Sequence, residues 1–119
     1  DRFPTVGKGF VEFEGKLFDF GTVSSDVAEE RIKKADWERP WASSPIAPLL
    51  GFGAAFPDVQ RSNPVVGLGS VAWVDGRLRS PCLNGNDARR DLNLYWRISI
   101  WKDLCRFLAV RLAVAQATT

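Results

Sequence analysis

Residues 67–112 constrain the fold of this chain more than any other segment, because their side chains follow a strand-like period. From residue 92 to residue 100, large apolar residues occupy the even positions. The apolar series is Leu92, Leu94, Trp96, Ile98 and Ile100, and the series between them is Asn93, Tyr95, Arg97 and Ser99. A period of two predicts a β-strand whose even positions face inward. Earlier in the segment, Asp75-Gly76 predicts a tight hairpin turn between two further strands.

The composition of the same segment indicates recognition of another molecule. Aromatic, arginine and aliphatic side chains stand at positions that the pattern directs toward solvent, on a frame of glycine, serine, proline, asparagine and aspartate. Folded proteins rarely expose many such side chains together unless something binds there. The remainder of the chain predicts a small globular scaffold.

The scaffold is predicted to combine short strands with a short helix. Residues 10–20 predict two short strands around a tight turn at Glu14-Gly15. Residues 24–40 predict an amphipathic surface helix that begins with the capping-box-like pair Asp26 and Glu29 and ends before Pro40. The alternating residues from 108 to 114 predict a core strand.

Residues 40–64 predict a long irregular connection, since prolines and glycines recur throughout them. We expect the large apolar residues nearby to pack against the domain rather than to form a ligand pocket. These residues are Trp37, Trp41, Leu49, Leu50, Phe52 and Phe56. Together the patterns predict one α+β domain over residues 1–119, with short antiparallel strands, few helices and long loops.

Composition argues against most enzyme classes. The chain has 119 residues and no histidine, which excludes Ser-His-Asp and Cys-His catalysis and histidine-bound zinc. Its two cysteines, Cys82 and Cys105, are too few for a four-thiolate metal site. Asp87, Asp91 and Asp103 lack the spacing of a calcium loop and suit turns better. We therefore expect no enzyme activity, no cofactor and no metal.

Charge and hydropathy limit the partners. The net charge is +2, and residues 69–119 hold eight Lys/Arg against four Asp/Glu. This mild excess permits an alternative function as a small basic nucleic-acid-binding domain, with Tyr95 and Trp96 as stacking platforms. Acidic residues interrupt the basic ones, however, so nucleic acid is the less favoured partner. No apolar run reaches the length of a membrane span.

A longer pattern covers roughly the last 45 residues of the chain. It reads G-S…R-S-P-x-L-N-G-x-x-A-R-x-D-L-x-L-x-W…W-x-D-x-C-R-F-L-A-V-R, from Gly69-Ser70 to Arg111. This pattern resembles the C-terminal variable region of the target proteins of diversity-generating retroelements, which occur in phages and bacteria. The first 65 residues carry no such resemblance.

The resemblance implies a C-type-lectin-like fold and a variable region at about residues 69–112. It implies a hypervariable binding protein, in which adenine-directed mutagenesis rewrites the side chains of one surface on a fixed scaffold. The expected partner is a protein or a cell-surface ligand, and the expected location is a phage particle or a bacterial cell surface. Trp101-Lys102-Asp103 matches the Trp-Asn-Asp of calcium-dependent lectins only in part, and a Glu-Pro-Asn sugar motif is absent, so calcium-dependent sugar binding is not expected.

The resemblance also implies which positions are diversified. An asparagine codon rewritten at its adenines can encode tyrosine, serine, arginine, cysteine, leucine or isoleucine, but not tryptophan or lysine when its third base is a pyrimidine. The candidate ligand-binding positions on this basis are Arg77, Cys82, Asn86, Arg90, Asn93, Tyr95, Arg97, Ile100 and Leu104. If Cys82 is diversified, Cys105 is expected to be a buried free thiol. A third reading is a structural virion or interaction protein that buries Tyr95, Arg97 and Leu104 in an oligomer interface.

Overall fold

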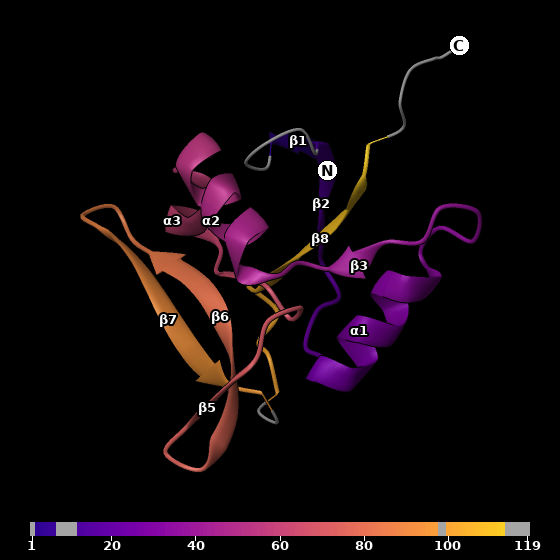
Figure 1. Ribbon diagram of the computed structural model, residues 1–119. Coiled ribbons are helices and arrows are strands. Elements are labelled where there is room, and N and C mark those ends of the chain that lie inside the picture. The colour runs from indigo at the N-terminus through magenta and orange to yellow at the C-terminus, as the bar shows by residue number, and fades with distance from the viewer. Residues whose placement is uncertain (1, 7–11, 98–99, 114–119) are drawn as a thin grey trace.

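The computed structural model describes residues 2–6, 12–97 and 100–113, which form one mixed β-sheet with three helices (Figure 1). The strands are β1 (Arg2–Val6), β2 (Glu12–Phe18), β3 (Ala42–Ser43), β4 (Val65–Val66), β5 (Ala72–Val74), β6 (Arg77–Gly85), β7 (Arg90–Trp96) and β8 (Arg106–Leu112). The helices are α1 (Ser25–Lys34), α2 (Ile46–Ala55) and α3 (Val59–Ser62). The predicted α+β class is confirmed.

The sheet is organised around β8 and β6. Its order is β1-β2-β8-β4-β6, with β3 paired to β8 and both β5 and β7 paired to β6. The neighbours are antiparallel except β4 and β8, which run parallel. The predicted C-terminal core strand is confirmed over residues 106–112, and Val114 lies outside the described residues. Strands from both ends of the chain therefore pair side by side.

Consecutive residues of the inner strands point into two separate hydrophobic clusters. On β8, Phe107 joins the cluster that contains Ala28 and Ile32 of α1, while Leu108 joins the cluster that contains Phe52 of α2. The same division holds on the other two inner strands. Val66 of β4 and Cys82 of β6 join the α1 cluster, while Val65 of β4 and Leu83 of β6 join the α2 cluster. The sheet thus has an α1 face and an α2 face, each covered by its helix (Figure 1). A strand buried on both faces reads as continuous apolar sequence, as in the stretch Phe107–Val110.

Two local predictions are confirmed. The Asp75-Gly76 turn joins β5 to β6, with φ of 51° and 74°, as a two-residue hairpin turn requires. The predicted helix is α1, although it ends at Lys34 rather than just before Pro40, and its N-cap is Ser24, whose hydroxyl accepts the N–H of Val27 at 3.3 Å. The capping-box interpretation of Asp26 is therefore wrong, and Asp26 lies in the first turn.

The predicted turn at Glu14-Gly15 is wrong, because β2 runs straight through it. Gly15 pairs with Phe3 of β1 on one side and with Val110 of β8 on the other. Backbone pairing along both edges outweighs the local preference of glycine for a turn. Residues 10 and 11 of the predicted hairpin lie outside the described residues.

The predicted irregular connection over residues 40–64 is also wrong, since it contains β3, α2 and α3. Pro48 fits in the first turn of α2, where backbone N–H groups have no acceptor within the helix. Gly53 allows a close approach to β6, because a Cβ there would lie 2.9 Å from Leu83 Cδ1. The expected packing is confirmed for Trp41, Leu49 and Phe52, which are buried, whereas Trp37 and Leu50 are exposed.

A buried arginine joins β8 to the first part of the chain. The Arg111 guanidinium bonds Glu14 at 3.1 Å and Asp36 at 2.7 Å, donates to the Arg39 carbonyl at 2.8 Å, and lies 4.0 Å from the centre of the Trp41 ring. Its side chain is only 6% exposed. Three polar contacts and an aromatic face compensate for removing this cation from water.

The two carboxylates around Arg111 should make the fold sensitive to acid. Burial raises the pKa of Glu14, but hydrogen bonds and the charges of Arg111 and Arg39 lower it further, so its pKa lies below the usual value. The hydrogen bond from Arg111 is the main reason that the pKa of Asp36 is also lowered. Both groups favour the folded state above their ordinary pKa values of 4.5 and 3.8, and this contribution is lost as pH falls through their lowered values.

We expect the free energy of unfolding, measured by urea titration, to decrease as pH falls through the lowered pKa values of Glu14 and Asp36, and to decrease less in Arg111→Met. Equal slopes for both proteins would contradict the assignment.

Candidate functional site

A cavity of about 340 Å³ opens on the α1 face of the sheet, between β7 and the segment that leads into β8. It is lined by Pro64, Cys82, Asn84, Tyr95, Ile100, Trp101, Lys102, Leu104 and Cys105. Its walls carry three large side chains that remain exposed to solvent: Tyr95 at 42%, Ile100 at 55% and Leu104 at 60%. Isolated exposed apolar residues are ordinary, but a group around one concavity is typical of a binding surface.

The burial of Trp101 explains why its neighbour Ile100 is left at the surface. Its indole N–H donates to the Ser25 hydroxyl at 2.8 Å, and its backbone exchanges hydrogen bonds with Val23 at 2.8 and 3.1 Å. The ring is buried and packs edge-on against Phe107. With Trp101 held against the start of α1, its neighbour Ile100 stays at the surface.

The turn after Trp101 is held by side chains from the surrounding scaffold. The Asn63 amide donates to the Leu104 carbonyl at 2.9 Å, and the Arg106 guanidinium donates to the carbonyls of Asp103 and Leu104 at 3.0 and 3.2 Å. The Cys105 N–H closes the turn on the Lys102 carbonyl at 3.1 Å. Leu104 therefore projects from a fixed backbone, which lowers the entropy lost when a ligand packs on it.

Tyr95 forms the opposite wall and is held in place at both ends. Its ring meets Trp101 edge-on with centroids 6.0 Å apart, and its hydroxyl accepts the Asn84 amide at 3.1 Å. The hydroxyl can still donate to a ligand, because a phenol both donates and accepts. An oriented tyrosine supplies a large contact area with few side-chain torsions to fix.

The floor of the cavity contains two buried thiols. Both cysteines are free, which confirms the expectation for Cys105. Burial raises the pKa of Cys82, as does the nearby Cys105, and burial also raises the pKa of Cys105. Both thiols are consequently protonated at neutral pH, and they contribute an apolar floor rather than nucleophiles.

The structure brings together only part of the predicted site. Tyr95, Ile100 and Leu104 surround the cavity, and Asn93 is exposed on the same face because it lies opposite Cys82 in the β6–β7 register. Arg77 lies on the α2 face instead, with its guanidinium 4.3 Å from the centre of the Trp96 ring.

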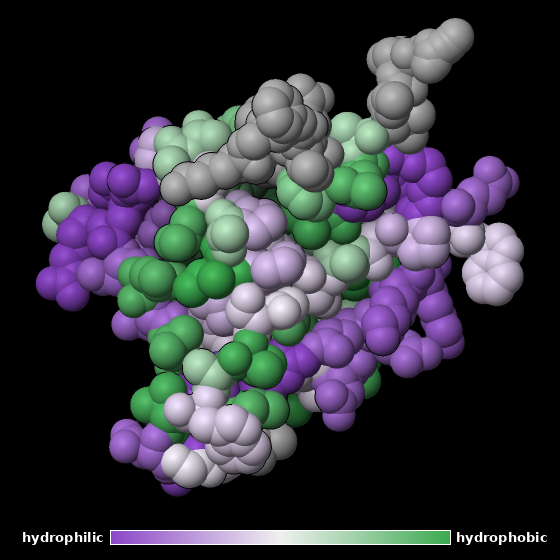
Figure 2. All heavy atoms as spheres, in the orientation of Figure 1, coloured by the Kyte–Doolittle hydropathy of each residue, from purple (hydrophilic) through white to green (hydrophobic). Residues whose placement is uncertain are grey.

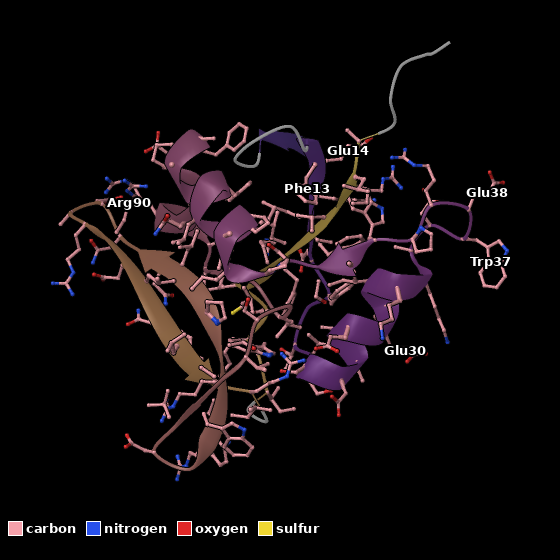
Figure 3. The ribbon with its side chains drawn as sticks, in the orientation of Figure 1. Phe13, Glu14, Glu30, Trp37, Glu38 and Arg90 are labelled. Carbon is pink, nitrogen blue, oxygen red and sulfur yellow. The ribbon has the colours of Figure 1, made fainter. Side chains whose placement is uncertain are left out.

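Asn86 and Arg90 lie at the tip of the β6–β7 hairpin, where both have contacts within the chain. The Asn86 side chain accepts the N–H groups of Ala88 and Arg89 and so forms the turn. Arg90 donates to the Gly53 carbonyl at 2.9 Å (Figure 3). Their contacts hold the hairpin to itself and to α2.

The structure contradicts a surface position for two of the candidates. Cys82 is fully buried in the α1-face cluster. Arg97 is largely buried, pairs with Glu29 of α1, and donates to the Leu68 carbonyl and the Ser80 hydroxyl at 2.9 and 2.8 Å. Arg97 keeps the phase that the strand period predicts, since its N–H still donates to the Leu78 carbonyl at 2.9 Å, but α1 covers this end of the face and Glu29 pairs with the guanidinium.

The predicted inward face of β7 is wrong as well. Leu92, Leu94 and Trp96 are exposed, although they share the α2 face with buried Leu83 of β6. β7 is an edge strand, and the helices that cover the inner strands leave these three side chains in contact with solvent. Figure 2 shows the result as apolar surface spread over α2 and the neighbouring strands. Ile98 and Ser99 of the predicted strand lie outside the described residues.

Sequence reasoning missed three residues of the rim: Pro64, Asn84 and Lys102. Asn84 and Lys102 lie within residues 69–112, the segment predicted to be variable, and the codon argument does not select Lys102 because a rewritten asparagine codon does not encode lysine. Pro64 carries no signal in the sequence, since it reaches the cavity through the pairing of β4 with β8.

The described residues contain no cluster of three or more histidine, cysteine or acidic side chains that could hold a metal ion. Among the helices of residues 2–6, 12–97 and 100–113, none has the length and apolar character of a membrane span. Compared with known proteins, the chain is matched by no family model, no characterised protein and no solved structure.

Proposed function

We propose that this chain is a binding protein without enzyme activity, which recognises a protein or cell-surface ligand through the cavity walls formed by Tyr95, Ile100 and Leu104. The observation that carries the proposal is the convergence of these three exposed side chains on one concave surface. Each projects from backbone that buried or hydrogen-bonded neighbours hold in place.

The cavity chemistry favours a ligand with an apolar group and an adjacent acceptor. The walls and floor are apolar, whereas Asn84 and Lys102 supply donors at the rim. An aliphatic or aromatic side chain of a partner protein would fill the cavity while a carboxylate or carbonyl met Lys102. Such a central apolar anchor with a polar rim is the usual anatomy of a protein interface.

The proposal includes diversification of this surface on a C-type-lectin-like scaffold, as in the target proteins of diversity-generating retroelements. Two features support it. The candidate contact residues Tyr95, Ile100 and Leu104 belong to the set that adenine-directed mutagenesis can produce, while Trp101, which packs against Tyr95 and is the neighbour of Ile100, does not. Strands from the two ends of the chain, β2 and β8, pair and close the domain.

The nucleic-acid alternative receives less support, because most of the C-terminal basic residues already have partners within the chain. Arg89 pairs with Asp91, Arg106 with Asp19, and Arg111 with Glu14 and Asp36. Arg90 and Arg97 donate to backbone carbonyls. The local excess of charge therefore does not amount to a free basic stripe.

Two libraries would test the binding surface. The first randomises Tyr95, Ile100 and Leu104; the second randomises Val27, Leu50 and Val71, which are also exposed apolar residues but lie elsewhere. We expect both libraries to fold and only the first to yield binders to a panel of proteins. In a selected binder, replacing the residue at position 95 with alanine should weaken affinity by about 30-fold, as at an interface hot spot. Equal yields from the two libraries would contradict the site.

Sequencing sibling copies of the gene tests diversification separately. We expect amino-acid differences to concentrate at Asn93, Tyr95, Ile100 and Leu104 and to spare Trp101. Differences spread evenly over the chain would refute diversification, while leaving the binding experiment to decide the function.

A further inference from the structure

β7 has a free backbone edge. It pairs with β6 along one side, and no other described strand pairs with it. The Arg97 N–H donates to the Leu78 carbonyl at 2.9 Å, so residues 91, 93, 95 and 97 face β6 in the antiparallel ladder. The N–H and C=O groups of residues 90, 92, 94 and 96 consequently point away from the sheet. Arg79 donates to the Leu94 carbonyl at 3.2 Å, and that oxygen keeps a second lone pair.

Apart from the Arg79 contact, this edge lacks the usual protection against pairing. β7 contains no proline, lysine or interruption of its ladder with β6. On its α2 face, Leu92, Leu94 and Trp96 are 44%, 39% and 36% exposed. A seven-residue strand with an open edge and an apolar stripe is a template for another strand.

The sequence of β7 is complementary to itself when two copies run antiparallel. With the two-fold axis at Asn93, all seven residues are paired, and the facing pairs are Arg90 with Trp96, Asp91 with Tyr95, Leu92 with Leu94, and Asn93 with Asn93. No like charges face each other. The outward backbone groups at positions 92 and 94 meet in the hydrogen-bonding pairs, as the ladder requires. Moving the axis by one residue leaves part of the strand unpaired.

We infer that β7 pairs with β7 of a second copy of this chain, forming a symmetric dimer with a continuous sheet. The leucines of both copies then cover one another on the α2 face. Tyr95 and Asn93 of both copies lie on the other face, so the dimer presents two candidate cavities on one side of the joined sheet. A ligand carrying repeated sites would bind both copies with increased avidity. This inference goes beyond the proposed binding function and does not depend on it.

Sedimentation of the full chain over a range of concentrations tests the dimer. We expect a reversible rise from the mass of one chain to twice that mass. Leu94→Pro should weaken dimerisation by about tenfold or more, because each pairing loses backbone hydrogen bonds. It should leave the domain folded, since the lost N–H points to solvent and proline is tolerated on edge strands. Trp37→Lys is the matched control, since Trp37 is 89% exposed on the far side of the molecule from Arg90 and should not affect the dimer (Figure 3).

A charge-exchange pair keeps the test decisive if Leu94→Pro fails to fold. L92K/L94K and L92E/L94E should each be monomeric, because residues of the same charge then face each other across the two-fold axis. Mixing the two variants should restore a dimer that contains one copy of each. A wild-type chain that stays monomeric to millimolar concentration would overturn the inference. So would a wild-type dimer that survives either double variant, or a mixture that stays monomeric.

Discussion

Replacing Arg111 by alanine is expected to lower the free energy of unfolding by about 3–5 kcal/mol, the usual result of breaking a buried ion pair from one side. The substitution removes the guanidinium that lies between Glu14 and Asp36 and covers the Trp41 ring. It leaves Glu14 with the longer Arg39 contact at 3.4 Å. Urea denaturation followed by tryptophan fluorescence measures the loss.

An exposed ion pair provides the control for Arg111. Arg89 pairs with Asp91 at 3.1 Å, with side chains that are 73% and 38% exposed. Arg89→Ala should therefore cost less than about 1 kcal/mol. If the two substitutions cost the same, Arg111 does not hold β8 to the first part of the chain in the way the contacts indicate.

Gly69→Ala is expected to have the second large effect, lowering the free energy of unfolding by about 3 kcal/mol or more, at the upper end of overpacking. A Cβ on Gly69 would lie 2.2 Å from the Ser43 carbonyl oxygen and 2.7 Å from the Ser44 carbonyl carbon. Those atoms are backbone, so they cannot move aside as a side chain would. The Gly69 N–H also bonds the Ser44 carbonyl at 2.9 Å, and any shift weakens this contact.

Gly51→Ala is the matched control for Gly69. Gly51 lies within α2, and a Cβ there would have no neighbour within 4 Å. Alanine in a helix interior is more stable than glycine by about 0.5–1 kcal/mol. Thermal or urea unfolding should therefore move in opposite directions for the two variants. A small effect at Gly69 would mean that the segment after β4 does not pack against Ser43 and Ser44 as closely as observed.

The structural features that the sequence predicts correctly depend on neighbours along the chain. The Asp75-Gly76 turn follows from the positive φ that this pair adopts readily. The helix after Ser24 follows from its apolar stripe, although it ends at Lys34, well before Pro40. The β8 strand follows from its apolar run, in which Leu108, Val110 and Leu112 recur at every second position. In each case the local preference and the tertiary environment agree.

The errors arise where tertiary contacts decide. Gly15 lies in the middle of a strand because β1 and β8 pair on both sides of it. Gly53 and Pro48 occur within a helix because one allows close packing on Leu83 and the other occupies the first turn. Leu92 and Leu94 alternate like core residues, yet the layers end at β6 and leave them in solvent. The alternation of apolar residues along a sequence cannot by itself distinguish an edge strand from a central one.

Local patterns along the chain are enough to predict strands around a hairpin in the C-terminal segment, and they include Tyr95, Ile100 and Leu104 among nine candidate positions. The folded structure shows that these three surround one cavity, while Cys82 and Arg97 are covered by the rest of the domain. The site depends on Trp101, which hydrogen-bonds Val23 and Ser25 more than seventy residues earlier in the chain. Such long-range contacts fix which side of a strand or turn is covered, and no local pattern contains that information.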